Sequence, residues 1–370
     1  MCLIESVGLC SPLGNYIDSC AAFECGLTNI SEITEHEVFC PGEEDPEKIK
    51  GHVISQATFG FSAIARHVIM AIESINDLKL NSKIFNSLKS VNICYVVPDP
   101  FERGIVKDEI KGLSRLERAQ EFGGLVLESL CKQPLEFSID QFTVCCGESG
   151  IVSSLKSIED RIENNYNETW LILAIDSLVD KNVVQILLSE GKLKTPLNSD
   201  GVVPGEVGVA LLLVSPEKSV KKEEYIELSA AFLVNEEYDY FSESPSLGKQ
   251  ITNSLTNYIS LKDFKVPQEL VVISSYSGSR ASGIEFGNIL VCLDNIDKLI
   301  NTNVKTLFPS ESYGYIGSAF GALAIALVGW LIKERELINT SFLIISGSDS
   351  KERLLLHLMP YSRSSSNVRR

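Results

Sequence analysis

The stretch Gln141–Leu155, QFTVCCGESGIVSSL, is the segment that most constrains how this chain can fold. Phe142 and Val144 favour a strand, and Gly147 and Gly150 permit a sharp bend directly after it. Beyond the bend, apolar residues recur at helical spacing, at Ile151, Val152, Leu155, Ile158 and Ile162. The sequence therefore predicts a strand, a tight turn and a helix. Such an elbow presents one side chain at a helix N-terminus, where the dipole favours a thiolate or another anion.

Short apolar strands alternate with helices along the rest of the chain. We expect strands at Leu3–Leu9, Val91–Val97, Trp170–Ile175, Ile226–Leu233, Leu270–Ser274 and Ser341–Ile345, and we expect Gly201–Leu213 to be a Pro-Gly turn that opens into a strand. We expect helices at Ile17–Glu24, Phe61–Leu78, Phe122–Leu130, Val183–Ser189, Ser246–Ile259, Glu285–Ile300 and Ser318–Lys333. Continuous apolar strands between helices indicate an α/β fold in which helices cover both faces of each sheet.

The order of elements repeats after a charged stretch, SPEKSVKKEE, at Ser215–Glu224. We place an internal boundary there, dividing the chain into residues 1–215 and 216–370, and expect two duplicated halves. The helices beginning near Ser149 and spanning Ser318–Lys333 should form the central, most buried pair. Close approach of these helices would be permitted by three glycines, Gly150, Gly317 and Gly321.

Composition narrows the functional classes. The chain has 370 residues, of which 44% are hydrophobic, so it can bury a large core, and its net charge of −16 disfavours binding to nucleic acid. The apolar stretch Ile316–Ile332 is short for a membrane span and contains three glycines, so we expect a buried helix. No basic segment followed by a long apolar run opens the chain, so we expect no signal peptide.

The cysteines and histidines suggest neither a metal nor a cofactor. None of the ten cysteines forms a C-x2-C pair, and none has a histidine at metal-ligand spacing; they are Cys2, Cys10, Cys20, Cys25, Cys40, Cys94, Cys131, Cys145, Cys146 and Cys292. Several lie in apolar runs, as expected of thiols in a reducing, cytoplasmic compartment. The four histidines, His36, His52, His67 and His357, fall outside every motif described below.

Four further regions should carry no site. We expect His67 to be a partly exposed helix residue, His36–Gly51 to be a surface loop, and the tail Tyr361–Arg370 to be disordered. The charged stretch Phe101–Leu116 shows no recognisable pattern.

Four segments, in order and at the right spacing, resemble the thiolase-like superfamily and specifically the β-ketoacyl synthases. They are Ile4–Gly14 (the family's TGxGxxxPLG opening), Leu173–Ser177 (GGxDS), Lys192–Gly208 (GRL…GFxPGEGAG) and Gly314–Gly321 (GHxxGAAG). The resemblance covers nearly the whole chain. It implies an α/β fold with five layers, αβαβα, made of two duplicated halves. It also implies a homodimer that pairs through the strand Phe142–Cys146.

The chain departs from that family at the catalytic positions. These synthases use a cysteine nucleophile and two histidines, which stabilise the enolate and oxyanion of the condensation. Tyr315 follows Gly314 where the second histidine would stand, and the loop Ser275–Arg280 lacks the first. The resemblance therefore implies a degenerate catalytic triad.

The residue at the nucleophile position depends on the alignment. Matching the helix to the family's CxSGLxAL register selects Glu148, whereas matching the turn to the CAG of chain-initiating synthases selects Cys145. We favour Glu148, because helix packing is harder to shift than a turn, and Cys145 stays open. The remnant site would comprise Cys145, Cys146, Glu148, Ser275, Tyr276 and Tyr315, lining a narrowed or closed cleft together with Phe320. We expect Glu148 to be hydrogen-bonded there.

The resemblance implies a non-catalytic, ketosynthase-like binding or adaptor module with a protein partner. One alternative is an acyltransferase or thioesterase that uses Cys145 or Cys146 on an acyl carrier or acyl-CoA. Another is a decarboxylase-like relic with Glu148. The segment Ser277–Gly287 resembles the NGE-R…EEWG pattern of a branch that also lacks the triad. Some members of that branch are encoded beside type VI secretion effectors, which suggests such an effector as the partner.

Overall fold

The computed structural model of the chain describes residues 3–39, 42, 44–105, 112–165, 168–216, 225–239, 242, 244–335, 337, 339–347 and 349–361. Most of the expected boundary Ser215–Glu224 and the expected disordered tail beyond Tyr361 lie outside these residues. The division of the chain at residue 215 therefore stays a prediction.

Strands and helices alternate as the sequence predicts. The strands are β1 (Leu3–Cys10), β2 (Ser31–Val38), β3 (Glu47–Gly51), β4 (Ser90–Val97), β5 (Ser138–Cys146), β6 (Thr169–Ser177), β7 (Glu206–Val214), β8 (Ile226–Asn235), β9 (Glu269–Ser274), β10 (Asn303–Leu307), β11 (Thr340–Gly347) and β12 (Glu352–Pro360). The α-helices are α1 (Tyr16–Glu24), α2 (Ser55–Thr58), α3 (Ala63–Asn81), α4 (Lys83–Ser87), α5 (Arg115–Cys131), α6 (Gly150–Asn164), α7 (Lys181–Ser189), α8 (Lys249–Ser260), α9 (Arg280–Asp294), α10 (Ser310–Tyr313) and α11 (Phe320–Arg335). Short 3-10 turns are η1 (Pro100–Arg103), η3 (Asp297–Leu299) and η4 (Gly317–Ala319).

The two halves of the main sheet have the same topology. The first half has strand order β5-β4-β6-β7-β1, and the second has β10-β9-β11-β12-β8. In each half the second strand pairs in parallel with both its neighbours, and the last two strands are antiparallel. The halves join where β1 meets β8, through Leu3 opposite Glu227 and Ile4 opposite Ile226. This repetition confirms the predicted duplicated halves.

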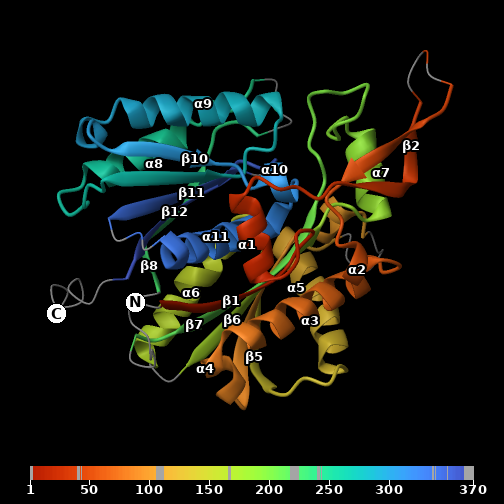
Figure 1. Cartoon of the computed structure of the whole chain (residues 1–370), viewed down its shortest axis with the longest axis horizontal. Coiled ribbons are helices and arrows are strands. Elements are labelled where there is room, and N and C mark those ends of the chain that lie inside the picture. Colours follow the sequence, from red (N-terminus) through yellow and green to blue (C-terminus); the bar gives the residue numbers. More distant parts are fainter. Residues whose placement is uncertain are drawn as a thin grey trace.

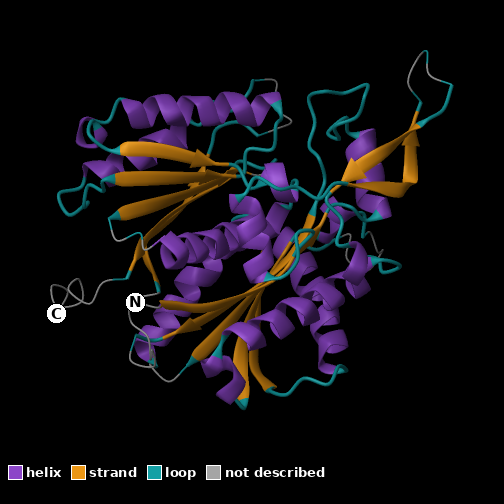
Figure 2. Ribbon diagram, viewed as in Figure 1, coloured by secondary structure: helices purple, strands orange, loops and turns teal. Residues whose placement is uncertain are grey.

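The elements stack in five layers (Figures 1 and 2). Helices α3 and α5 cover the outer face of the first half-sheet, and α8 and α9 cover the outer face of the second. Helices α6 and α11 lie between the two half-sheets and share one hydrophobic core with both. The predicted αβαβα architecture is therefore confirmed.

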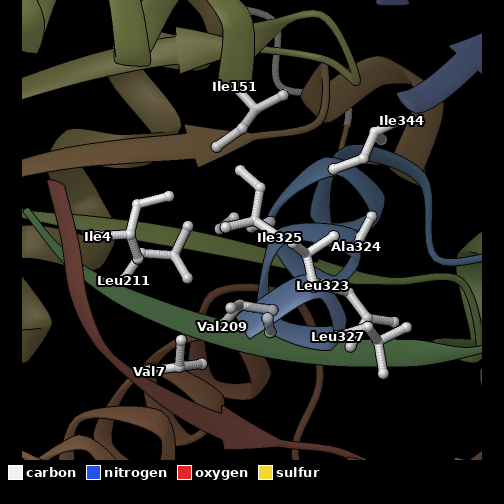
Figure 3. Close-up of a cluster of buried hydrophobic side chains, with 14 of the residues drawn as sticks. Ile4, Val7, Ile151, Val209, Leu211, Leu323, Ala324, Ile325, Leu327 and Ile344 are labelled. Atoms are coloured by element: carbon white, nitrogen blue, oxygen red, sulfur yellow. The ribbon is translucent and has the colours of Figure 1, made fainter. Parts of the chain in front are cut away.

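Helices α6 and α11 share the central core, as predicted. The predicted role of Gly150 and Gly317 in their approach is wrong, because a Cβ on Gly150 would meet Val96 and Cys145 and one on Gly317 would meet Asp176 and Arg103. A Cβ added to Gly321 of α11 would come within 2.5 Å of Ile151 Cγ2 on α6, so only glycine permits this approach. Figure 3 shows Ile325 of α11 pointing toward Ile151 in this core. The segment Gly317–Arg335 is the one helix in the described residues that is long and apolar enough to cross a membrane, and 78% of its apolar window is buried. It is the core helix expected from the sequence.

Three sequence predictions about local structure are wrong. The expected loop His36–Gly51 contains β3, which pairs with β2, because Ile33 and Ile49 are buried beside α7. Strands β10 and β12 were not predicted, although β10 lies beside β9 at the edge of the sheet and the apolar run of β12 fills a place between β11 and β8. Helix α9 begins at Arg280, five residues before the predicted Glu285, because the Ser279 side chain accepts a hydrogen bond from the backbone of the first turn.

Candidate functional site

The predicted elbow is present. Strand β5 ends at Cys146, the chain turns through Gly147 with φ +76°, and α6 begins at Gly150. The backbone N–H of Gly147 donates to the Val97 carbonyl at 2.7 Å, which ties the turn to the end of β4. A Cβ at Gly147 would lie 2.7 Å from Arg115 Nη2 in a backbone conformation that side chains rarely adopt, so the turn requires glycine.

Glu148 lies in this turn and is hydrogen-bonded through both carboxyl oxygens. Its side chain is buried, with 6% of the residue exposed. The Tyr315 hydroxyl donates to Oε1 at 2.5 Å, and the Ser346 hydroxyl donates to Oε2. Burial raises the pKa of Glu148 to about 7, although the hydrogen bonds from Ser346 and Tyr315 lower it. The expectation of a buried, hydrogen-bonded Glu148 is confirmed.

The two elbow cysteines lie in a setting that keeps their thiols protonated. Cys145 is half-buried on β5, with its sulfur 3.8 Å from that of Cys94. This contact and burial both raise the pKa of the Cys145 thiol. Burial raises the pKa of Cys146 to about 12, although the nearby Arg115 opposes the shift. Because the thiolate is the nucleophilic form, neither cysteine is activated at neutral pH.

A buried ion pair, Arg103 with Asp176, lies at the segment that leads into α11. Arg103 binds Asp176 through two hydrogen bonds, Nε to Oδ1 at 2.8 Å and Nη2 to Oδ2 at 2.7 Å. Asp176 Oδ2 also accepts from the Ser318 backbone N–H at 2.8 Å, just before α11. Burial acts to raise the pKa of Asp176, but the charge and hydrogen bonds of Arg103 act more strongly in the opposite direction, so the pKa lies below its ordinary value. Arg103 comes from the stretch in which we recognised no pattern, since its partner is 73 residues away.

One histidine prediction is wrong. His67 is buried at 3% exposure and bonds the Tyr95 hydroxyl at 2.9 Å through Nδ1, because α3 packs this face against the sheet. His52 lies outside the motifs in sequence, but the fold brings it beside Gly314, since its Cδ2 is only 2.8 Å from a Cβ built on that glycine. Burial lowers the pKa of both imidazoles to about 4, so both are neutral at neutral pH. The remaining described imidazole, that of His357, bonds Tyr258; the His36 side chain lies outside the described part.

A cavity of about 280 Å³ opens between the two halves of the chain, where β9 and β11 end and α9 begins, and Leu187, Lys192 and Val202 line it from the first half. Three of the expected site residues, Ser275, Tyr276 and Tyr315, line it. Cys145, Cys146 and Glu148 do not line it, and Phe320 is buried in the central core instead. Tyr315 thus has two roles, since it lines the cavity and its hydroxyl bonds Glu148. The structure thus brings only part of the predicted lining together around one cavity, and the narrowing of the family's cleft stays a prediction.

The structure offers no evident metal site. In the residues it describes, no group of three or more histidine, cysteine, aspartate or glutamate side chains is arranged to hold a metal ion. The polar groups around the elbow are instead engaged with one another, as Glu148 is with Tyr315 and Ser346.

Comparison with known proteins identifies the fold. No family model and no curated protein matches this sequence. Among solved structures, the ketosynthase from module 6 of the bacillaene synthase of Bacillus subtilis 168 is similar at a TM-score of 0.66 and 11% identity, covering 98% of this chain and 72% of that one. The oxazolomycin ketosynthase domain from Streptomyces albus JA3453 is similar at a TM-score of 0.68 and 12% identity, covering 98% of this chain and 74% of that one. A complex of a type II PKS acyl-carrier protein with its ketosynthase is similar at a TM-score of 0.65 and 12% identity, covering 97% of this chain and 98% of that one.

The chain therefore has the thiolase-like fold of ketosynthases. Identities of 10–12% establish the shared fold and leave the chemistry to be argued from this chain's own residues.

Proposed function

We propose that this protein is a catalytically degenerate, ketosynthase-like binding module that acts through a protein partner and catalyses no condensation. The observation that carries the proposal is Glu148, which lies at the tip of the elbow with both carboxyl oxygens held by hydroxyl groups. We infer that it occupies the position of the family's nucleophile. A carboxyl held in this way has a structural role and cannot take up an acyl group as a cysteine would.

The surrounding residues support the absence of condensation chemistry. That reaction needs a thiolate to carry the acyl group and hydrogen-bond donors to stabilise the enolate. Burial raises the pKa of Cys146 to about 12, and the pKa of Cys145 is raised as well. Tyr315, where the family has a histidine, already donates its hydroxyl proton to Glu148.

The same observations weigh against the two alternatives. An acyltransferase or thioesterase acting through Cys145 or Cys146 would need a depressed thiol pKa, and both are raised. A decarboxylase-like relic would need free donors near Glu148, but the neighbouring hydroxyls of Tyr315 and Ser346 are engaged by its carboxyl group.

The partner is proposed from charge and from resemblance. A net charge of −16 favours a protein with a basic face, because complementary charge accelerates association and aligns the partners. The resemblance of Ser277–Gly287 to the branch found beside secretion effectors supports such an effector as the partner, in the cytoplasm. One similar structure is a ketosynthase bound to an acyl-carrier protein, so a carrier is the competing partner.

We also propose a homodimer. Strand β5 is an outer strand of the sheet, paired only with β4 among the described strands. An open strand edge is a ready template for pairing with a second chain. Two copies joined edge to edge through Phe142–Cys146 would continue the first half-sheet across the dimer.

Affinity capture with candidate partners tests the adaptor role. Glu148→Gln and Tyr315→Phe, which alter the elbow, should leave partner binding unchanged. Serine substitutions at exposed apolar residues outside the site, such as Phe59, Leu80 and Ile300, should identify the binding face by a loss of at least tenfold in affinity. Loss of binding only in the elbow variants would contradict the proposed outer binding surface.

A further inference from the structure

The cavity between β9, β11 and α9 has a built interior that the proposed adaptor function does not use. Its volume of about 280 Å³ is close to the lower end of the range of roughly 300–1,000 Å³ typical of small-molecule sites. Ser274 ends β9 and Ser275 follows it on one wall, and Tyr315 and Gly347 approach from two other segments. The cavity is therefore assembled from parts of the chain that are distant in sequence, which fixes its shape.

The charges that line the cavity disfavour an anionic ligand. The described lining contains two cations and four carboxylates, namely Lys192, Arg353, Asp200, Asp239, Glu285 and Asp349. Lys192 Nζ lies 2.7 Å from Asp349 Oδ2, and Arg353 Nε lies 2.6 Å from Glu285 Oε1. Both cations are thus paired within the wall. A phosphate or carboxylate would enter a region of net negative charge and find no unengaged cation among the described lining residues.

Three serines on the wall define what the ligand must supply. Ser274 Oγ accepts from the Tyr276 N–H at 3.2 Å, and Ser275 Oγ accepts from the Gly347 N–H at 3.2 Å. Ser246 Oγ accepts from the Gly248 N–H at 3.4 Å. None of the three hydroxyl protons has an acceptor among the described residues. Ser274 is only 4% exposed, so leaving its proton unbonded is costly.

We propose that this cavity binds a small, uncharged organic molecule whose carbonyl or hydroxyl oxygens accept hydrogen bonds from Ser246, Ser274 and Ser275. Side chains such as Phe286, Ile289 and Val202 contact its apolar part. Its size is that of a monosaccharide or a capped amino acid. The cavity adjoins the elbow through Tyr315, which lines it and bonds Glu148, whereas Glu148 and both elbow cysteines do not line it.

Matched probes that differ in charge test the inference by ligand-observed NMR on the full chain. N-acetylglucosamine and N-acetylalanine methylamide supply carbonyl and hydroxyl acceptors without charge, and N-acetylglucosamine 6-phosphate adds only a phosphate. We expect the two uncharged probes to bind and the phosphorylated one to bind at least tenfold more weakly. Absence of binding by both uncharged probes, or equal or tighter binding of the phosphorylated probe, would overturn the proposal.

Three variants locate the bound probe. Ser275→Ala removes one donor and should weaken binding about 2- to 10-fold. Ala281→Phe places a ring in the cavity that Ala281 lines and should abolish binding. Ser153→Ala, at an exposed position on α6, should change nothing. Thermal melts confirm that each variant is folded, and the Ser275→Ala result decides the question if Ala281→Phe fails to fold. Probe binding that survives both Ser275→Ala and Ala281→Phe would overturn the proposed ligand site. The adaptor proposal would stand unaffected, because partner capture tests it separately.

Discussion

Replacing Glu148 with glutamine tests whether the elbow carboxyl is as strongly perturbed as its surroundings imply. Its pKa is about 7 in the folded chain, against an ordinary value of 4.5. Between these two values the folded chain holds a proton that the unfolded chain has released, so stability falls as the pH rises. The difference is worth about 3 kcal/mol, most of which is lost between about pH 5 and pH 8. Glutamine keeps the shape and does not titrate, so it removes this pH dependence.

Urea unfolding of both proteins at several pH values in this window measures the effect. The wild-type free energy of unfolding minus that of Glu148→Gln should fall by about 2–3 kcal/mol from about pH 5 to pH 8. The subtraction removes contributions from other buried acids with raised pKa values, such as Glu102 and Asp77. Tyr315→Phe removes a hydrogen bond that lowers this pKa, so it should move the transition to higher pH. A difference that stays constant, or that grows with pH, would refute the reasoning.

Three further predictions concern packing, thiols and assembly. Gly321→Val should lower the free energy of unfolding by about 1–3 kcal/mol or more, because the added Cβ would overlap Ile151. The control Gly124→Ala adds its methyl group in open space and should be neutral or stabilising. Urea unfolding of both variants measures the difference. Cys145 and Cys146 should react with iodoacetamide at pH 8 far more slowly than exposed Cys25, as peptide mass mapping would show; equal rates would contradict their raised pKa values. Light scattering at micromolar concentration should give twice the chain mass of 40.7 kDa, and a monomer would contradict the proposed pairing through β5.

The sequence carried most of the fold because its signals are local. Apolar runs such as Trp170–Ile175 and the glycine-marked turn at Gly147 depend only on neighbouring residues, and both appear where they were expected. Strand β12 was missed because its apolar run follows a polar segment and has no helix after it to mark a repeat. Helix α9 was placed late because its start depends on the cap at Ser279.

The site was only partly accessible from sequence, because its key contacts join distant residues. The pairing of Glu148 with Tyr315 followed from the resemblance, but Ser346, 198 residues away, did not. Its segment SGSDS, directly after an apolar strand, was the available signal. The cavity depends on where five segments meet, and no local pattern encodes that. The partnership of Arg103 with Asp176 likewise needed the folded chain.

Intact-protein mass spectrometry after incubation with malonyl and acyl thioesters tests the central claim most directly. The account predicts an unchanged mass and no release of carbon dioxide, because the thiol pKa values of Cys145 and Cys146 are both raised. Cys145→Ala and Cys146→Ala should behave as the wild type does. An acyl adduct on Cys145 or Cys146, with turnover that disappears in the matching alanine variant, would contradict the account and identify the protein as an acyltransferase.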